Sequence, residues 1–178
     1  GLLFGMRRSE ALGLRWSDID FKNHTIMISN TVTQMRTLLI DEHTKSFTSH
    51  RMLSVMDDVI GYFKRLKAQQ EANKREYGDK YHDSDFVCVW PDGRIILPGY
   101  VSHNFKKLLQ KYDLPEIRFH DLRHTAGSLL LAQGVNIKQI QEFLGHADVT
   151  TTLNIYTHID EDAKKETAAA MGKVLKLV

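Results

Sequence analysis

Basic side chains and a tyrosine gather in the segment 119–158. Within it, His120 and Arg123 stand three positions apart, His146 follows a Leu-Gly pair, and Tyr156 follows a Thr-Thr pair after three intervening residues. Arginine donates paired hydrogen bonds to phosphate oxygens and keeps its charge, and histidine exchanges protons near neutral pH. A tyrosine hydroxyl becomes a nucleophile when a base or a nearby positive charge assists it. Together these residue types are suited to nucleophilic attack on a phosphate ester.

Two helices are predicted to position these groups. A first helix from about His120 would put His120 and Arg123 on one face, because residues three apart are neighbours on a helix. A stripe with helical spacing lies beside that face and is expected to be buried; it consists of Leu122, Ala126, Leu129 and Leu130. The polar pair would then be carried on a helix anchored by its own apolar face.

The second helix is predicted to run from Asn136 to Leu144. Asn136 is suited to the N-cap, and Gly145 is suited to the left-handed position that ends a helix. This ending would put His146 just beyond the helix, where its side chain can point into a cleft.

Two further motifs stand toward the amino end of the sequence. Arg7 follows a Gly-Met pair and precedes Arg-Ser-Glu, which ends at Glu10. Lys45 stands in the segment before His50 and Arg51. With the His-x-x-Arg, Leu-Gly-His and Thr-Thr-x-x-x-Tyr-x-His patterns, these motifs span nearly the whole chain. The set resembles the catalytic domain of the tyrosine recombinase (integrase) family, and Lys45 falls where that family carries its β-hairpin lysine.

Four of these residues are expected to form or support a clamp on the attacked phosphate. Arg7 and Arg123 are expected to hold the non-bridging oxygens of the attacked phosphate, where charge builds up in the transition state. His146 is expected to donate to one of those oxygens. Glu10 is expected to support the site by holding Arg7 in its rotamer.

The remaining roles concern the nucleophile and the protons. Tyr156 is expected to be the nucleophile, with His120 near it as proton acceptor or orienting group. By resemblance, Lys45 would protonate the leaving 5′-oxygen. His124 and His158 are interpreted as structural or supporting residues.

The resemblance also implies a fold, a reaction and partners. The fold is expected to be mainly α with a small three-stranded antiparallel sheet. The reaction would cleave and rejoin DNA through a 3′-phosphotyrosyl intermediate, with no cofactor and no metal. The implied partners are double-stranded DNA attachment sites, further copies of the chain in a homo-tetramer, and accessory DNA-bending or excision proteins. No membrane partner is implied, and the expected location is the bacterial cytoplasm, at the nucleoid.

Three alternatives stay open from the residues alone. His120 and His124 imitate the two histidines of a zinc-binding helix, although Asp121 replaces the usual glutamate and Arg123 would put a cation beside the metal. A catalytically idle DNA-binding module would keep the same fold. A topoisomerase-like DNA relaxase would share the chemistry but reseal the same strands.

The elements outside the motifs are predicted from periodicity and turn residues. Alternation or β-rich composition indicates strands over 24–30, 31–40 and 50–55, with Lys45 in the turn between the second and third. Helical spacing indicates helices over 8–14, 56–77, 100–112 and 160–176.

Bulk composition agrees with one catalytic domain over 1–178. The chain has 178 residues, 42% of them hydrophobic and 26% charged, which suits a single domain with its own core. The start at Gly1, directly before the first arginine motif, is interpreted as an amino-terminal truncation that leaves out a DNA-clamping domain. The single cysteine, Cys88, is interpreted as a buried, inert thiol. The net charge of +2 means that any DNA-binding face must be locally basic.

Overall fold

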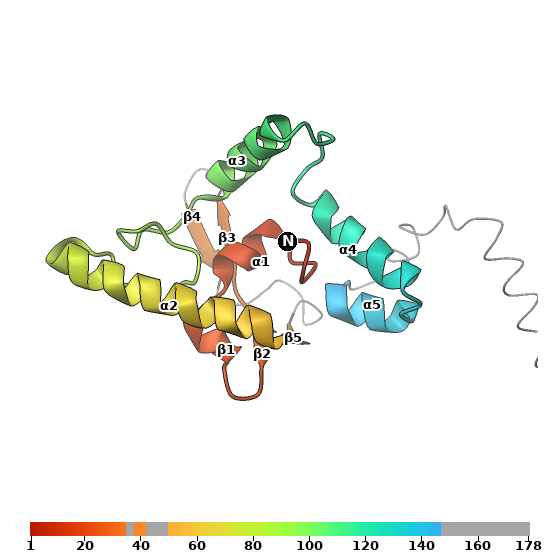
Figure 1. The fold of residues 1–178 in the computed structure, drawn as a ribbon, viewed down its shortest axis with the longest axis horizontal. Helices are drawn as coiled ribbons and strands as arrows, with labels where there is room; N and C mark the ends of the chain where they lie inside the picture. Colours follow the sequence, from red (N-terminus) through yellow and green to blue (C-terminus); the bar gives the residue numbers. More distant parts are fainter. Residues whose placement is uncertain (35–37, 42–49, 147–178) are drawn as a thin grey trace, which may run out of the picture.

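The computed structural model describes residues 1–34, 38–41 and 50–146. Its fold is mainly helical with a small three-stranded antiparallel sheet, as the sequence predicts. The helices, including two short 3₁₀ turns labelled η, are α1 Arg8–Gly13, η1 Trp16–Asp18, α2 Asp57–Tyr77, η3 Gly78–Lys80, α3 Pro98–Lys111, α4 Asp121–Ala132 and α5 Ile137–Leu144 (Figure 1). The strands are β1 Ile19–Asp20, β2 Thr25–Ile28, β3 Thr31–Gln34, β4 Leu38–Asp41 and β5 Arg51–Ser54.

The three-stranded sheet has the order β1-β2-β5, and both pairings are antiparallel. Ile26 pairs with Ile19 on one side and with Leu53 on the other. Along β2 the side chains alternate, since Ile26 and Ile28 are buried and Met27 is exposed. The predicted strands over 24–30 and 50–55 are therefore confirmed.

The prediction of one continuous strand over 31–40 is wrong. This segment forms two strands, β3 and β4, which pair antiparallel with each other in a separate sheet, with Val32 opposite Ile40 and Gln34 opposite Leu38. Both halves have the composition of a strand, and the residues between them include no glycine, proline, asparagine or aspartate that would signal a reversal. The predicted site of Lys45, between the second and third strands, lies outside the described residues.

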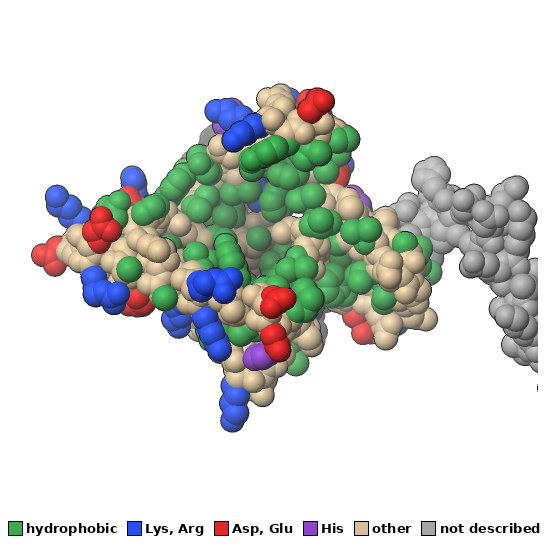
Figure 2. All heavy atoms as spheres, viewed as in Figure 1, with side chains coloured by type: hydrophobic (Ala, Val, Ile, Leu, Met, Phe, Trp, Pro, Cys, Tyr) green, Lys and Arg blue, Asp and Glu red, His purple; other side chains and the backbone are tan. Residues whose placement is uncertain are grey.

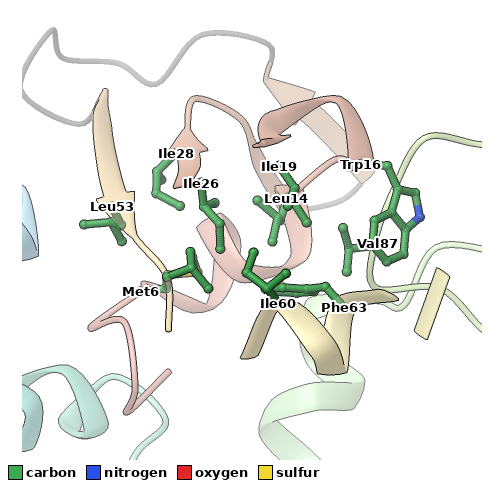
Figure 3. Packing of buried hydrophobic residues seen from close by; sticks show 11 residues of the cluster. Met6, Leu14, Trp16, Ile19, Ile26, Ile28, Leu53, Ile60, Phe63 and Val87 are labelled. Carbon is green, nitrogen blue, oxygen red and sulfur yellow. The ribbon is translucent and has the colours of Figure 1, made fainter. Parts of the chain in front are cut away.

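The main core forms where the sheet packs against α2 and the start of the chain. Figure 3 shows Ile26, Ile28 and Leu53 of the sheet facing Ile60 and Phe63 of α2, with all five side chains buried. Burying a side chain of this size stabilises the fold by about 1.5–3 kcal/mol before the entropy cost of ordering it. The core thus fixes the sheet, and with it the strand β5 that leads into the site.

A smaller apolar cluster forms where α1 and β3 meet the segment around Phe86. Leu12, Val32 and Phe86 are buried there, and Cys88 packs against them half-buried. Burial raises the pKa of the Cys88 thiol, which keeps it protonated at neutral pH. The structure therefore gives Cys88 an apolar, weakly reactive setting, although the side chain is less fully enclosed than predicted.

The helices α4 and α5 lie side by side next to the amino-terminal residues (Figure 1). The boundaries predicted for α5 are confirmed, because the Asn136 side chain accepts a hydrogen bond from the Lys138 backbone N–H at 2.8 Å and Gly145 has φ 67°. The stripe predicted on α4 is partly wrong, because Leu129 is 55% exposed. The buried face of α4 consists of Arg123, Ala126 and Gly127 instead.

The face of the molecule in Figure 2 carries both hydrophobic and charged side chains. Hydrophobic side chains gather between α3 and α4, and lysine and arginine side chains lie mostly over α2 and toward one end of α3. Within the described part of the chain, none of the helices combines the length and the apolar character that crossing a membrane requires.

Candidate active site

Arg7 stands directly before α1 and is held by Glu10. The Arg7 backbone N–H donates to Glu10 Oε2 at 2.9 Å, and Arg7 Nη1 donates to Glu10 Oε1 at 2.6 Å. The first N–H groups of a helix lack partners within the helix, and a carboxylate three positions on can reach back to the N-cap backbone. The Arg-x-x-Glu spacing therefore closes the helix end and orients the guanidinium with one side chain.

The Glu10 carboxylate is shared by three arginines. Arg51 Nη2 and Nη1 donate to it at 3.0 and 3.3 Å, and Arg123 Nη1 lies 3.9 Å from Oε2. Burial alone would raise the pKa of Glu10, but the hydrogen bonds and charges of Arg51 and Arg7 outweigh it and lower the pKa below its ordinary value. Glu10 is therefore ionised at neutral pH, and the cluster keeps an excess of positive charge.

Arg123 is fully buried, which the predicted face shared with His120 did not anticipate. Its Nη1 donates to the Gly5 carbonyl at 2.8 Å and its Nε donates to His146 Nε2 at 3.2 Å. Its Nη2 is buried and has no hydrogen-bond partner among the described residues. Burial, with a smaller contribution from Arg7, lowers the pKa of Arg123 to about 9, so the guanidinium stays charged at neutral pH. A buried cation with an unused donor is costly unless an anion completes it.

His146 follows the left-handed Gly145 and is turned inward. Its ring is buried, and its backbone is tied to α5 because its N–H donates to the Gln141 carbonyl at 3.1 Å. Burial and the charges of Arg123 and Arg7 lower the pKa of His146 to about 4. His146 is therefore neutral at neutral pH. It lies just beyond the end of α5, as predicted, and its ring contacts Arg123.

His120 lies at the N-cap of α4 and is exposed. Arg7 and His120 line one pocket of about 490 Å³, together with Arg8, Ser9, Ser102 and Arg118. Burial of part of the ring, then the charges of His124 and Arg123, lower the pKa of His120 below its ordinary value. A neutral imidazole facing this pocket is able to accept a proton.

The rings of His120 and His124 meet edge to face, with centroids 5.1 Å apart. Over the ranges that the structure describes, no cluster of three or more histidine, cysteine or acidic side chains is arranged to hold a metal ion. The zinc-binding alternative therefore lacks a third ligand within those ranges.

The structure brings together Arg7, Glu10, Arg123 and His146 and puts His120 at the edge of the same region. The predicted residues Lys45 and Tyr156 lie outside the described residues, so their roles stay predictions. Arg51 was not predicted as a site residue. It could have been found from the alternation of β5, in which Arg51 and Leu53 face inward while Met52 faces outward.

The model of the phage integrase family matches residues 2–163 of the chain. The chain belongs to the phage integrase family. It is 30% identical to the ICEBs1 integrase of Bacillus subtilis over 173 residues, which cover 97% of the chain and 47% of that protein. It is 29% identical to a XerC-like tyrosine recombinase of Caldanaerobacter subterraneus over 167 residues, which cover 87% of the chain and 43% of that protein. The chain thus spans less than half the length of these relatives.

The fold of this phage integrase family member is similar to that of solved relatives. The Tn1549 transposon integrase in complex with transposon right end DNA superimposes with a TM-score of 0.79 at 26% identity, covering 98% of the chain and 56% of the solved integrase chain. XerA recombinase superimposes with a TM-score of 0.69 at 22% identity, covering 96% of the chain and 54% of that protein, which supports the fold alone. The predicted family and fold class are confirmed.

Proposed function

We propose that this chain is the catalytic domain of a tyrosine-type site-specific DNA recombinase. Family membership and the cluster around Glu10 support the proposal. The observation that carries it is Arg123, a buried cation whose Nη2 is unpartnered among the described residues and which contacts His146. Three arginines face one carboxylate there, so the cluster has an excess of two positive charges. A phosphodiester is the anion of DNA that would meet this charge.

The first chemical step would exchange one ester for another. Tyr156 Oη attacks the phosphorus, the bond from phosphorus to the 5′-oxygen breaks, and a 3′-phosphotyrosyl link forms. The phenolic proton passes to a base, for which His120 is the candidate. Its lowered pKa keeps the imidazole neutral and able to accept a proton, and it lines the same pocket as Arg7. Lys45 would return a proton to the 5′-oxygen.

The arginines would act on the transition state. Negative charge grows on the non-bridging oxygens as the fifth bond to phosphorus forms, and preorganised donors stabilise it. Arg123 Nη2 and the Arg7 guanidinium supply such donors, and the neutral His146 supplies a third. In the second step a 5′-hydroxyl of a partner duplex attacks the phosphotyrosyl link and releases Tyr156, so the bond energy is conserved.

The proposal includes two kinds of partner, the DNA substrate and other protein subunits. The solved Tn1549 integrase is bound to transposon DNA, and this supports double-stranded DNA as the substrate here. Pairwise strand exchange between two duplexes further requires several catalytic domains, for which a homo-tetramer and accessory DNA-bending proteins are proposed. The proposed place of action is the bacterial nucleoid, where the DNA lies.

Covalent capture tests the proposal. The chain is incubated with a pool of nicked duplexes of randomised sequence, denatured in detergent, and the DNA that stays attached to protein is sequenced. The expected result is attachment at the 3′ side of a break, lost in Tyr156→Phe. Attachment at a 5′ end, or binding of DNA without a covalent product under conditions in which a full-length relative yields one, would contradict it. Joining of captured DNA to a second duplex separates a recombinase from a relaxase, which reseals the original strand.

A further inference from the structure

Arg51 makes three side-chain contacts that none of the roles above requires. Its Nη2 and Nη1 donate to the Glu10 carboxylate at 3.0 and 3.3 Å, and its Nε donates to the Phe143 carbonyl at 2.8 Å. Its side chain also packs on Gly145, where an added Cβ would lie 2.9 Å from Arg51 Nη1 and 3.1 Å from Arg51 Cδ. The side chain is only 6% exposed.

These contacts join two of the segments that carry the proposed phosphate donors. Glu10 holds Arg7 at the start of α1, and Phe143 and Gly145 form the end of α5 that leads into His146. Arg7 Nη2 also lies 3.4 Å from the Gly145 carbonyl, so the two elements meet around Arg51. One side chain from β5 thus spans the distance between the carriers of Arg7 and His146.

The chemistry of these contacts favours arginine over any other residue. The last carbonyls of a helix lack partners within the helix, and a cation near them is stabilised by the helix dipole. The planar guanidinium donates in fixed directions and can reach a carboxylate and a carbonyl together, whereas a lysine ammonium acts as a single point charge. Because Arg51 is buried and its Nε and Nη2 donate to α5 and Glu10, it is turned inward rather than toward the pocket that Arg7 and His120 line.

We propose that Arg51 is a positioning residue for DNA cleavage, which holds Arg7 through Glu10 and His146 through the end of α5, so that both donors meet one phosphate. This inference rests on the proposed recombinase function. It differs from a purely stabilising role, since it requires that the donors lose their geometry when Arg51 is changed while the fold persists.

The test compares Arg51→Met and Arg51→Lys with Arg94→Met, a matched control in an exposed loop ion pair with Asp92. Rates of covalent capture are measured on a duplex recovered with the unchanged chain, at a temperature where circular dichroism finds each variant folded. Arg51→Met is expected to be slower by about 100-fold, because small misplacements of catalytic groups have effects of that size. Arg51→Lys should fall between, and Arg94→Met should match the unchanged chain. Equal rates for all three would overturn the proposal.

A substrate with sulfur in place of the bridging 5′-oxygen separates two ways in which Arg51 could act. Sulfur makes departure easy without a proton donor, since a thiol has a pKa of about 8.5. If Arg51 acts through Arg7 and His146, which face the non-bridging oxygens, the sulfur substrate leaves the defect in place. Recovery of the rate would mean that Arg51 serves the leaving group, and the proposal would fail.

The titration of His146 gives a readout that needs no DNA. Followed by NMR and assigned against His146→Gln, the pKa should move from about 4 toward its ordinary value in both Arg51 variants, and stay low in Arg94→Met. Because Arg51→Lys keeps the positive charge, a rise in the pKa of His146 in that variant means that His146 has lost its position. An unchanged pKa in both folded variants would overturn the proposal. If the unchanged chain makes no covalent complex, the proposed function fails, and this titration still decides the role of Arg51 in holding His146.

Discussion

Arg123 donates from Nε to Nε2 of His146 over 3.2 Å, and both side chains are buried. A neutral imidazole accepts through one nitrogen and carries its hydrogen on the other, so His146 holds its hydrogen on Nδ1. The charge of the site therefore resides on the arginines, and the role proposed for His146 is that of a neutral donor. Such a donor keeps its hydrogen across the whole neutral pH range.

The lowered pKa of His146 predicts how stability depends on pH. Between about pH 4 and 6.5 the unfolded chain binds a proton at this residue that the folded chain does not, so the free energy of unfolding falls as pH drops through that window. The contribution is at most about 3 kcal/mol. Denaturant unfolding at neutral pH and near pH 4 should show a smaller loss for His146→Gln than for the unchanged chain. An identical loss in the two proteins would contradict the burial of a neutral ring.

The contact between Gly145 and Arg51 predicts different results for two glycines with positive φ. Gly145 has φ 67° and an added Cβ would meet Arg51, whereas Gly134 has φ 77° and open space around it. Alanine in the left-handed region costs about 1–2 kcal/mol in either position. Gly145→Ala should lose more unfolding free energy than Gly134→Ala and should also slow covalent capture. The idea fails if the two variants lose the same stability and keep the same rate.

Tyr156→Phe tests the nucleophile. The change removes one oxygen, so far-UV circular dichroism and DNA binding in a gel-shift assay should be preserved while the covalent product disappears. The reason is that the attacking atom itself is lost, which no neighbouring group replaces. Covalent product persisting in this variant would assign the nucleophile to another residue.

Lys45→Ala tests the proposed proton donor. An alkoxide is a poor leaving group, since its conjugate acid has a pKa near that of water, roughly 15. Cleavage of ordinary DNA should be crippled, and a bridging 5′-sulfur should restore much of the rate. The same sulfur should not rescue Arg123→Ala. A variant at Lys45 that is crippled equally on both substrates would point to phosphate binding in place of proton donation.

Chelation tests the absence of a metal requirement. In the proposed reaction, the excess positive charge of the arginine cluster would supply the charge stabilisation that a metal ion supplies in metal-dependent nucleases. Covalent capture should therefore proceed at the same rate with and without EDTA in excess. A rate that collapses with EDTA and returns with added zinc or magnesium would argue for a metal-dependent reaction.

The sequence by itself determined the features that depend on neighbours a few residues away. The Arg7–Glu10 spacing sets the start of α1, Asn136 and Gly145 set the two ends of α5, and the alternation along β2 sets its buried face. These are local rules, in which helix caps and side-chain periodicity act within one turn or one strand. The motif order likewise identified the family before any contact was known.

Only the tertiary structure decided which partners the charged side chains have. Arg123 turns inward because Gly5 and His146, both far away in sequence, supply its acceptors, and nothing local to α4 signals that choice. The bridging contacts of Arg51 were missed for the same reason. The reversal between β3 and β4 was missed because no turn residue between the two strands signals it. A buried charge is stable only where distant segments bring complementary groups to it, so its direction is fixed by packing and not by the residues beside it.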